Sequence, residues 1–282
     1  RMLHFAPERA IPTLYKTTLK HWLGRYQRKN RGETVGEVFL FADEFTNYMD
    51  VEIGIKMIEL LDRLGYEVII PKHVESGRTA ISKGMLKVAK RVARKNVLLL
   101  KDVVSEDVPL VGIEPSCILS FRDEYPDLVG DDLKEEALRL GKNCLLYDEF
   151  FTREIRAGRI GAEQFTDQPL KIMLHGHCHQ KSLASVEPSR EMLSLPVNYS
   201  VEVIPSGCCG MAGAFGYEKK HYELSMKIGE QVLFPAVRDA GEDVCISAPG
   251  TSCRQQIEDG TGKQALHPIE VLYKALKCMK EK

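Results

Sequence analysis

The chain is organised around the stretch Ser206-Gly207-Cys208-Cys209-Gly210-Met211-Ala212-Gly213, which directly follows the apolar run of residues 201–205. Two adjacent cysteines do not easily form a disulfide with each other, and flanking glycines let the backbone come close to a bulky bound group. This combination predicts a site for a metal or a cluster rather than a structural disulfide.

Two more cysteines follow strand-like apolar runs. One lies in His175-Gly176-His177-Cys178-His179-Gln180, and the other ends Ala248-Pro249-Gly250-Thr251-Ser252-Cys253. Because open parallel sheets place their ligands at the carboxyl ends of the strands, these cysteines are expected at one edge of a sheet. The four candidate metal ligands are therefore Cys178, Cys208, Cys209 and Cys253.

From about residue 37 onward, short apolar runs alternate with segments of helical periodicity in the order β-α-β-α-β. The same order begins again near residue 170. We predict an α/β protein with two tandem, related Rossmann-like units that contain parallel sheets and are joined by helices. The expected divisions are an N-terminal arm at 1–35, a first unit at 36–130, a helical joint at 131–168 and a second unit at 169–282.

The two repeats can be overlaid. Residues 38–44 lie over 172–178, residues 71–78 over 205–211 with one extra residue, and residues 114–117 over 249–253. In this overlay Glu44 stands where Cys178 stands, and only Cys117 remains as a thiol in the first unit. We therefore expect no cluster in the first unit and a solvated or salt-bridged rim at its edge.

The cysteine pattern as a whole resembles the cysteine-rich CCG domain, which occurs in heterodisulfide reductase, in the iron–sulfur subunit of glycolate oxidase and in anaerobic glycerol-3-phosphate dehydrogenase. It looks most similar to the C-terminal region of FAD-linked, iron–sulfur D-2-hydroxy acid dehydrogenases, which act on substrates such as D-lactate or D-2-hydroxyglutarate. The supporting phrases are Asp43-Glu44-Phe45-Thr46-Asn47-Tyr48, Ile81-Ser82-Lys83-Gly84, Glu114-Pro115-Ser116-Cys117, His177-Cys178-His179-Gln180-Lys181 and Gly207-Cys208-Cys209-Gly210-Met211-Ala212-Gly213-Ala214-Phe215-Gly216.

The resemblance implies a cysteine-bound cluster of the [4Fe-4S] type in the second unit. The family usually ends its motif with Cys-x-x-Cys, which here reads Gly250-Thr251-Ser252-Cys253, so one of five family cysteines is absent. Thiolates also bind zinc, and a thiol cluster without metal remains a further alternative.

Further residues are expected next to the metal without binding it: His177, His179, Gly207, Gly210, Gly250 and Cys117. If the strand before Cys178 continued through the three histidines, His175, His177 and His179 would all point to the face opposite Cys178. A histidine there could hydrogen-bond a sulfur, take up a proton or replace a ligand, and the alternative role is to cap the following helix. The glycines lack the spacing of a nucleotide-binding motif.

By resemblance, the function is electron transfer. FAD on a separate upstream domain would oxidise the hydroxy acid, ferredoxin-like clusters would relay the electrons, and this chain would pass them to a quinone or another acceptor. On this interpretation the fragment alone lacks the flavin-dependent activity. Two alternatives stay open: a catalytic heterodisulfide or quinone reductase, and a structural or interaction module that binds zinc or no metal.

Composition narrows the remaining possibilities. The 282 residues are 44% hydrophobic and carry a net charge of -1, which gives no electrostatic reason to expect nucleic acid as a partner. No apolar run approaches the roughly eighteen residues of a membrane span. Eight cysteines without a signal peptide suggest reduced thiols and a cytoplasmic location, with peripheral attachment at the inner face of the membrane left open. Cys144, Cys245 and Cys278 are expected to be inert, and a chain that begins with Arg1 suggests a processed or excised product.

Overall fold

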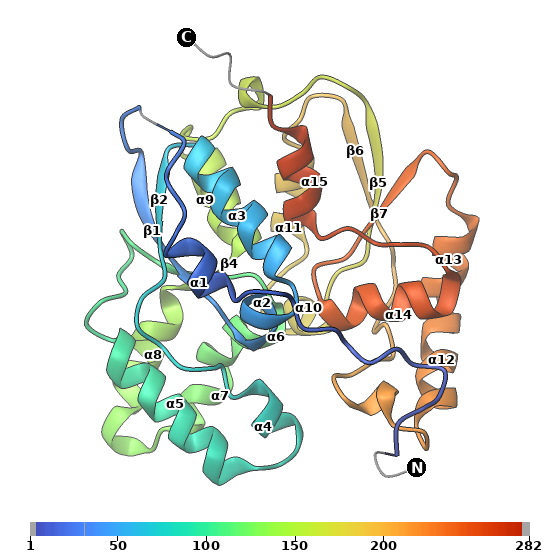
Figure 1. Cartoon of the computed structure of the whole chain (residues 1–282), viewed down its shortest axis with the longest axis horizontal. Coiled ribbons are helices and arrows are strands. Elements are labelled where there is room, and N and C mark those ends of the chain that lie inside the picture. Colours follow the sequence, from blue (N-terminus) through green and yellow to red (C-terminus); the bar gives the residue numbers. More distant parts are fainter. Residues whose placement is uncertain (1–3, 31, 278–282) are drawn as a thin grey trace. The chain divides into compact units, whose positions relative to one another are not determined.

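The computed structural model describes residues 4–30 and 32–277 (Figure 1). The chain divides into two compact units. The first unit is Leu14–Arg159, and the second unit comprises the described parts of Arg1–Thr13 and Ile160–Lys282. Each unit contains one parallel β-sheet with helices around it. The prediction of two tandem α/β units with parallel sheets is confirmed, whereas Cys278 lies outside the described residues.

The sheet of the first unit has four parallel strands in the order β2-β1-β3-β4. Its central strand β1 buries Val38, Leu40 and Phe41, because a strand with helices on both sides has little surface left for solvent. The strands are β1 (Gly36–Phe41), β2 (Tyr66–Ile69), β3 (Leu110–Gly112) and β4 (Cys144–Leu146).

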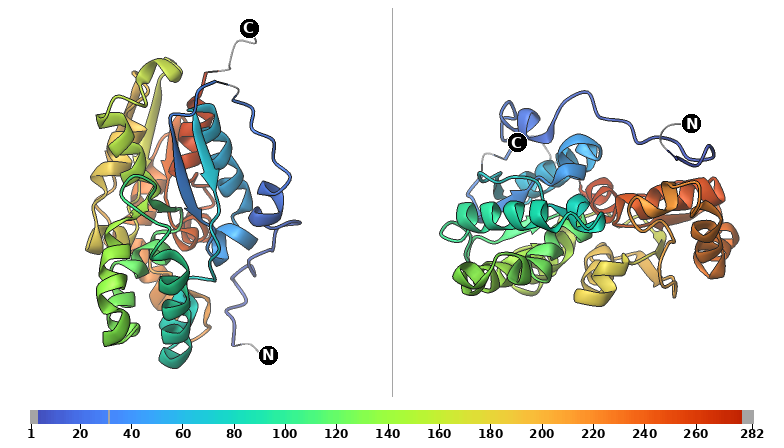
Figure 2. Two further views of the ribbon diagram at one scale, coloured as in Figure 1. Left: turned by 90° about the vertical axis from the view of Figure 1, so that its left-hand side faces the viewer. Right: turned by 90° about the horizontal axis from the view of Figure 1, so that it is seen from below.

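Helix α3 packs along β2 in this unit (Figure 2). It buries one apolar face that includes Met57 and Leu61, as expected for an amphipathic helix on a sheet. The helices of the unit are α1 (Leu19–Leu23), α2 (Glu44–Tyr48), α3 (Val51–Arg63), α4 (Arg78–Ser82), α5 (Leu86–Leu100), α6 (Pro115–Ile118), η1 (Leu119–Phe121), α7 (Glu124–Leu128), η2 (Asp131–Leu133), α8 (Lys134–Lys142) and α9 (Tyr147–Arg156).

Strand β4 lies inside the segment for which only helices were expected. It pairs with β3 from Leu110↔Cys144 to Gly112↔Leu146 and so belongs to the first sheet. Three residues between two helices are too few to show the alternating pattern that reveals a strand. The fully buried side chain of Cys144 fits the inert role expected for it.

The sheet of the second unit has three parallel strands in the order β6-β5-β7. They are β5 (Leu170–Leu174), β6 (Tyr199–Val203) and β7 (Val244–Ser247). With β5 matched to β1, β6 to β2 and β7 to β3, the strand order is the same as in the first unit. The carboxyl ends of all three strands meet at one edge of the sheet.

The helices of the second unit are η3 (Ala162–Gln164), α10 (Cys178–Leu183), α11 (Glu187–Leu193), η4 (Phe215–Tyr217), α12 (Tyr222–Gln231), α13 (Leu233–Asp239), α14 (Thr251–Thr261) and α15 (Pro268–Ala275). Helices α12 and α13 follow one another with a break at Val232, where φ is -144°. Pro235 explains the break, because proline has no N–H to donate and is tolerated only in the first turn of a new helix.

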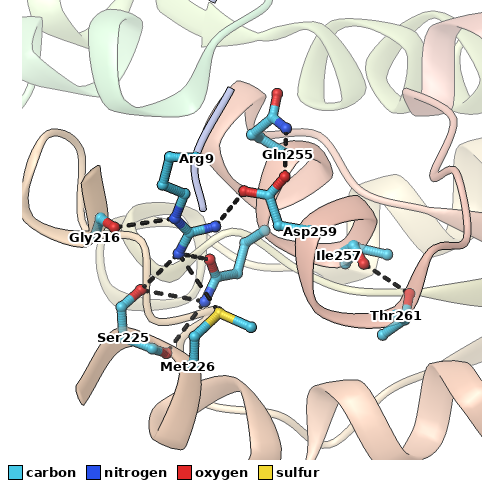
Figure 3. A network of polar contacts seen from close by, with 9 residues as sticks. Arg9, Gly216, Ser225, Met226, Gln255, Ile257, Asp259 and Thr261 are labelled. Carbon is cyan, nitrogen blue, oxygen red and sulfur yellow. Dashed lines mark hydrogen bonds and ion pairs between the residues drawn. The ribbon is translucent and has the colours of Figure 1, made fainter. Parts of the chain in front are cut away.

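Residues 4–13 of the N-terminal arm belong to the second unit and anchor there through Arg9, whereas the arm from Leu14 onward belongs to the first unit (Figure 3). Its side chain is fully buried, pairs with Asp259, donates from Nε to the Gly216 carbonyl at 3.0 Å and from Nη2 to Ser225 Oγ at 3.2 Å. Nη2 also donates to Gln256 Oε1 at 2.5 Å. These contacts fix the glycine-rich loop of residues 207–216 against α12 and α14.

No helix in the described parts of the chain has the length and apolarity to cross a bilayer.

Candidate metal centre

Each of the four predicted ligands follows one strand of the second sheet. Cys178 is the first residue of α10 after β5, Cys208 and Cys209 lie in the loop after β6, and Cys253 is the third residue of α14 after β7. The common edge of the parallel strands thus brings together four cysteines that are far apart in the sequence.

The four thiols form a continuous row of side-chain contacts, here called the thiol row. Cys178 contacts Cys208, Cys208 contacts Cys209, and Cys209 contacts Cys253. Cys209 and Cys253 are 4% and 2% exposed, whereas Cys178 and Cys208 are half-buried. All four are free thiols rather than disulfides.

Hydrogen bonds within the row shift the pKa values of its cysteines in opposite directions. Bonds from Cys178 and Cys209 lower the pKa of Cys208, which also accepts from the Gly210 N–H at 3.3 Å. A bond from Cys209 lowers the pKa of Cys253. Donating these bonds, together with burial, raises the pKa of Cys178 and of Cys209. Four thiolates in such close contact would repel one another, so ionising all four requires a positive charge among them.

His177 caps helix α10. Its Nδ1 accepts the His179 backbone N–H at 3.2 Å, so the neutral ring carries its proton on Nε2. A Cβ atom at Gly250 would lie 2.4 Å from Cδ2 of His177 and 3.1 Å from Sγ of Cys253. The imidazole fills the space beside Gly250, which explains why a residue with a side chain does not fit there.

The condition on which the expected orientation of the three histidines depended is not met. Strand β5 ends at Leu174 and α10 begins at Cys178, so the alternation of a strand does not extend through these residues. The Nδ1 atom of the half-buried His179 lies 3.9 Å from Sγ of Cys178 instead of on the opposite face.

His175 belongs to the site although it was not among the predicted site residues. It is fully buried, and one of its ring nitrogens and the sulfurs of Cys209 and Cys253 all lie within 4.8 Å of one another. Nδ1 lies 2.7 Å from Ser206 Oγ, while Nε2 has no nitrogen or oxygen partner among the described residues. The imidazole also interacts with Cys253 and helps to lower the pKa of that thiol. The signal in the sequence was its position directly after a buried strand.

Lys181 places a positive charge beside the thiol row. Its ammonium group donates to the Ser206 carbonyl and, at 3.0 Å, to the Gly207 carbonyl. Burial lowers the pKa of Lys181, and the negative charge of the nearby cysteines opposes this shift. The side chain therefore links α10 to the cysteine loop and offsets part of the charge of the thiolates.

Glycine is structurally required at position 210 of the cysteine loop but not at position 207. Gly210 has φ +96°, and a Cβ atom there would lie 2.2 Å from the Ser225 carbonyl oxygen. At Gly207 an added Cβ would meet nothing within 4 Å, so packing does not demand a glycine. Its predicted place next to a metal stays a prediction.

The corresponding edge of the first unit is closed by its own hydrogen bonds. Ser76 donates to both carboxylate oxygens of Glu44, at 2.8 Å from N and 2.7 Å from Oγ. Burial, reinforced by the charges of Glu44 and Glu114, raises the pKa of Asp43 to about 8. Burial also raises the pKa of Cys117, whose part in a metal site stays a prediction. Within 4–30 and 32–277, the His, Cys and carboxylate groups that could hold a metal all belong to the second unit.

The second edge fits a cysteine-bound metal or iron–sulfur group. It supplies four thiols in a continuous row, whose joint ionisation requires added positive charge, and a buried imidazole nitrogen without a nitrogen or oxygen partner among the described residues. Thiolates bind both zinc and iron–sulfur clusters, so the donor set identifies a soft-metal site without choosing between them.

Comparison with known proteins agrees with this assignment. Residues 172–258 match the family model described as "Cysteine-rich domain", CCG. The resemblance to the CCG domain is confirmed. The matched segment contains most of β5, all of β6 and β7 and the whole thiol row, so the match to the CCG domain and the candidate metal centre coincide.

Three relatives extend the similarity beyond the CCG domain. D-2-hydroxyglutarate dehydrogenase of Escherichia coli is 25% identical over 277 residues, which cover 96% of this chain and 26% of the relative. One subunit of the anaerobic glycerol-3-phosphate dehydrogenase of Escherichia coli is 27% identical over 95% of this chain and 66% of its own length. Lactate utilization protein A of Bacillus subtilis is 29% identical over 84% of this chain and 98% of its own length.

These relatives associate the chain with oxidoreductases. The chain spans about a quarter of the length of D-2-hydroxyglutarate dehydrogenase and about two thirds of that of the glycerol-3-phosphate dehydrogenase relative. The match to part of D-2-hydroxyglutarate dehydrogenase agrees with the resemblance to D-2-hydroxy acid dehydrogenases that the sequence analysis noted.

Proposed function

We propose that the second unit binds an iron–sulfur cluster of the [4Fe-4S] type through Cys178, Cys208, Cys209 and Cys253, and that the chain transfers electrons within a D-2-hydroxy acid oxidoreductase. The observation that carries this proposal is the thiol row, which joins the ends of three strands in the segment that matches the CCG domain. A structural disulfide would not require all four thiols to meet.

The proposed reaction divides between this chain and its partners. A D-2-hydroxy acid gives up two electrons and two protons to become the 2-oxo acid, and FAD on a separate domain or protein accepts them. Ferredoxin-like clusters then pass single electrons to this chain, which delivers them to a quinone or another acceptor. The name of one relative, D-2-hydroxyglutarate dehydrogenase, supports the substrate class. A cytoplasmic location belongs to the same proposal.

The surrounding residues suit this task. A bound iron–sulfur cluster takes up and releases single electrons, and its anionic sulfurs are stabilised by nearby positive groups. Lys181 supplies one such charge, and Cys253 lies in the first turn of α14, where the helix dipole favours negative charge. The ring of His177 and the sulfur of Cys253 both border Gly250, and we expect the Nε2–H of His177 to donate to a sulfur of the row.

The first test is anaerobic reconstitution with iron and sulfide, followed by metal analysis and a visible absorption spectrum. We expect about four irons per chain and a broad charge-transfer band. Both should be lost in Cys178→Ser and kept in Cys245→Ser, whose thiol lies in β7 outside the row. One zinc without a visible band would make the second unit a structural module, and a chain that binds no metal would refute the proposal.

A second test uses the complete enzyme that contains this chain. Replacing Cys208→Ser together with Cys209→Ser should abolish turnover with the natural acceptor, because electrons can no longer leave through this chain. Reduction of the flavin by substrate in a single turnover should remain. Unchanged turnover with the natural acceptor would exclude the electron-transfer role.

A further inference from the structure

We propose that His175 is a fifth ligand of the metal centre, with its Nε2 atom bound directly to one metal atom of the group held by the thiol row. This inference rests on the proposed function, since it requires that the row binds a metal. The proposed centre then has four cysteine ligands and one neutral imidazole ligand, and the hydroxyl group of Ser206 orients the imidazole.

The burial of His175 gives the first argument. Its side chain is fully buried, and its Nε2 has no nitrogen or oxygen partner within the described parts of the chain. The imidazole faces sulfur instead, since its interaction with Cys253 helps to lower the pKa of that thiol. A buried polar atom without a partner is costly and rare in folded proteins. A ring nitrogen of His175 lies within 4.8 Å of the sulfurs of Cys209 and Cys253, so a metal bound by these thiolates would satisfy it.

The contact with Ser206 gives the second argument. Nδ1 of His175 lies 2.7 Å from Ser206 Oγ. A metal-bound histidine almost always donates its other ring N–H to an oxygen, which fixes the tautomer and the direction of the ring. With the proton on Nδ1, the lone pair is on Nε2. Ser206 starts the loop that carries Cys208 and Cys209, so one segment positions both the thiols and the imidazole.

The other histidines of the site are less suited to bind metal. Nδ1 of His177 accepts the N–H of His179, which places the proton on Nε2 and makes that atom a donor. Binding a metal through Nε2 would move the proton to Nδ1 and break the cap of α10. His179 is only half-buried. One ligand atom each of His177, Cys178 and His179 also lie within 4.8 Å of one another, but we expect the cap to keep His177 from binding the metal. His177 therefore provides a matched control for His175 within the same site.

A neutral imidazole also changes the electronic properties of the site. At the fifth ligand position, a neutral imidazole carries one negative charge fewer than a thiolate would. Histidine-ligated iron–sulfur centres accordingly have higher reduction potentials than all-cysteine centres. We therefore expect His175→Cys, which places a fifth thiolate at the centre, to shift the reduction potential of the reconstituted centre to a lower value. His177→Cys should leave the centre with four thiolates and the imidazole of His175, so its reduction potential should stay close to that of the wild type.

The decisive experiment is pulsed electron paramagnetic resonance on the metal-loaded chain, recorded in its oxidised and reduced states. Two samples are compared, one with histidine at natural abundance and one with ¹⁵N-histidine. We expect a strong nitrogen coupling that changes with the isotope, as a directly bound imidazole produces. It should disappear in His175→Ala, return when ¹⁴N-imidazole is added, and persist in His177→Asn, in which asparagine retains a capping oxygen.

The outcomes separate the two proposals. A wild-type chain that holds iron but shows only the weak couplings of hydrogen-bonded nitrogens overturns the ligand assignment and leaves the proposed function intact. A strong coupling that survives in His175→Ala and vanishes in His177→Asn also overturns it. A chain that holds no iron refutes the proposed function itself. Because the isotope comparison uses the wild-type chain, the test does not depend on the folding of a variant.

Discussion

The carboxyl edges of the two sheets use the same backbone framework for different chemistry. Asp43 caps α2 after β1 just as His177 caps α10 after β5, with each side chain accepting an N–H of the following helix. Gly77 and Gly210 both have positive φ values after the second strand. Residues 114–117 and 250–253 complete the match, because each quartet runs from a helix N-cap to a cysteine at the third helical position.

The side chains at these matching positions decide whether the edge needs a partner. In the first unit, Ser76 bonds to Glu44 and Thr46 bonds to Asp43 at 2.8 Å. In the second unit, thiols contact one another and His175 retains a buried nitrogen without a partner among the described residues. The comparison teaches that the backbone produces the geometry of the edge, whereas a few side chains determine whether that edge can bind a metal.

The two buried cysteines at equivalent positions offer the strongest test of this comparison. We expect Cys253→Ser to weaken metal binding by more than about 100-fold, since loss of an outer-sphere partner alone costs about 10–100-fold. Cys117→Ser should leave metal binding unchanged, because Cys117 is surrounded by carboxylates rather than thiols. Iron content after competition with a chelator measures both effects. Equal losses in the two variants would contradict the division of roles between the units.

Much of this architecture could be predicted from the sequence. The repeated order of strands and helices predicted two parallel sheets, and cysteines placed directly after apolar runs predicted that Cys178, Cys208, Cys209 and Cys253 would meet. These features depend on local patterns and on the general rule that parallel strands end at one edge. They therefore require no knowledge of side-chain packing.

Other features depend on contacts that no local pattern encodes. Strand β4 is only three residues long and is defined by its pairing with β3. The orientation of His175, His177 and His179 depends on where β5 ends and α10 begins, and boundaries between elements are the least predictable part of a sequence. The buried position of Arg9 arises from partners more than two hundred residues away.

The matching glycines Gly210 and Gly77, which both have positive φ values, should differ in their tolerance of alanine. Gly210→Ala forces a side chain into positive φ and brings Cβ to 2.2 Å from a backbone oxygen, so we expect a loss of about 3–5 kcal/mol in the free energy of unfolding. At Gly77 the nearest atom is a side-chain methyl of Val92 at 3.1 Å, and we expect about 1–2 kcal/mol. Urea titrations of both variants measure the difference. A larger loss at Gly77 would show that the loop of the second unit adapts more easily than its backbone contacts indicate.

The last prediction concerns the pH dependence of the first unit. Burial raises the pKa of Asp43 from 3.8 to about 8, so the folded chain holds a proton that the unfolded chain releases. Its contribution to stability is complete below about pH 4 and is lost as the pH rises through 8. Between pH 6 and 9 the wild type should lose about 2–3 kcal/mol at this group, at 1.36 kcal/mol per pKa unit.

Asp43→Asn tests this directly, because asparagine keeps the cap of α2 but does not titrate. Urea unfolding at pH 6 and pH 9 should show a smaller fall in stability for the variant than for the wild type, with the two proteins differing most at pH 9. Identical pH profiles would mean that Asp43 is already ionised at pH 6, stabilised by its bonds from Phe45 and Thr46. The first edge would then carry a buried negative charge, which would distinguish it still further from an edge built to hold thiolates around a metal.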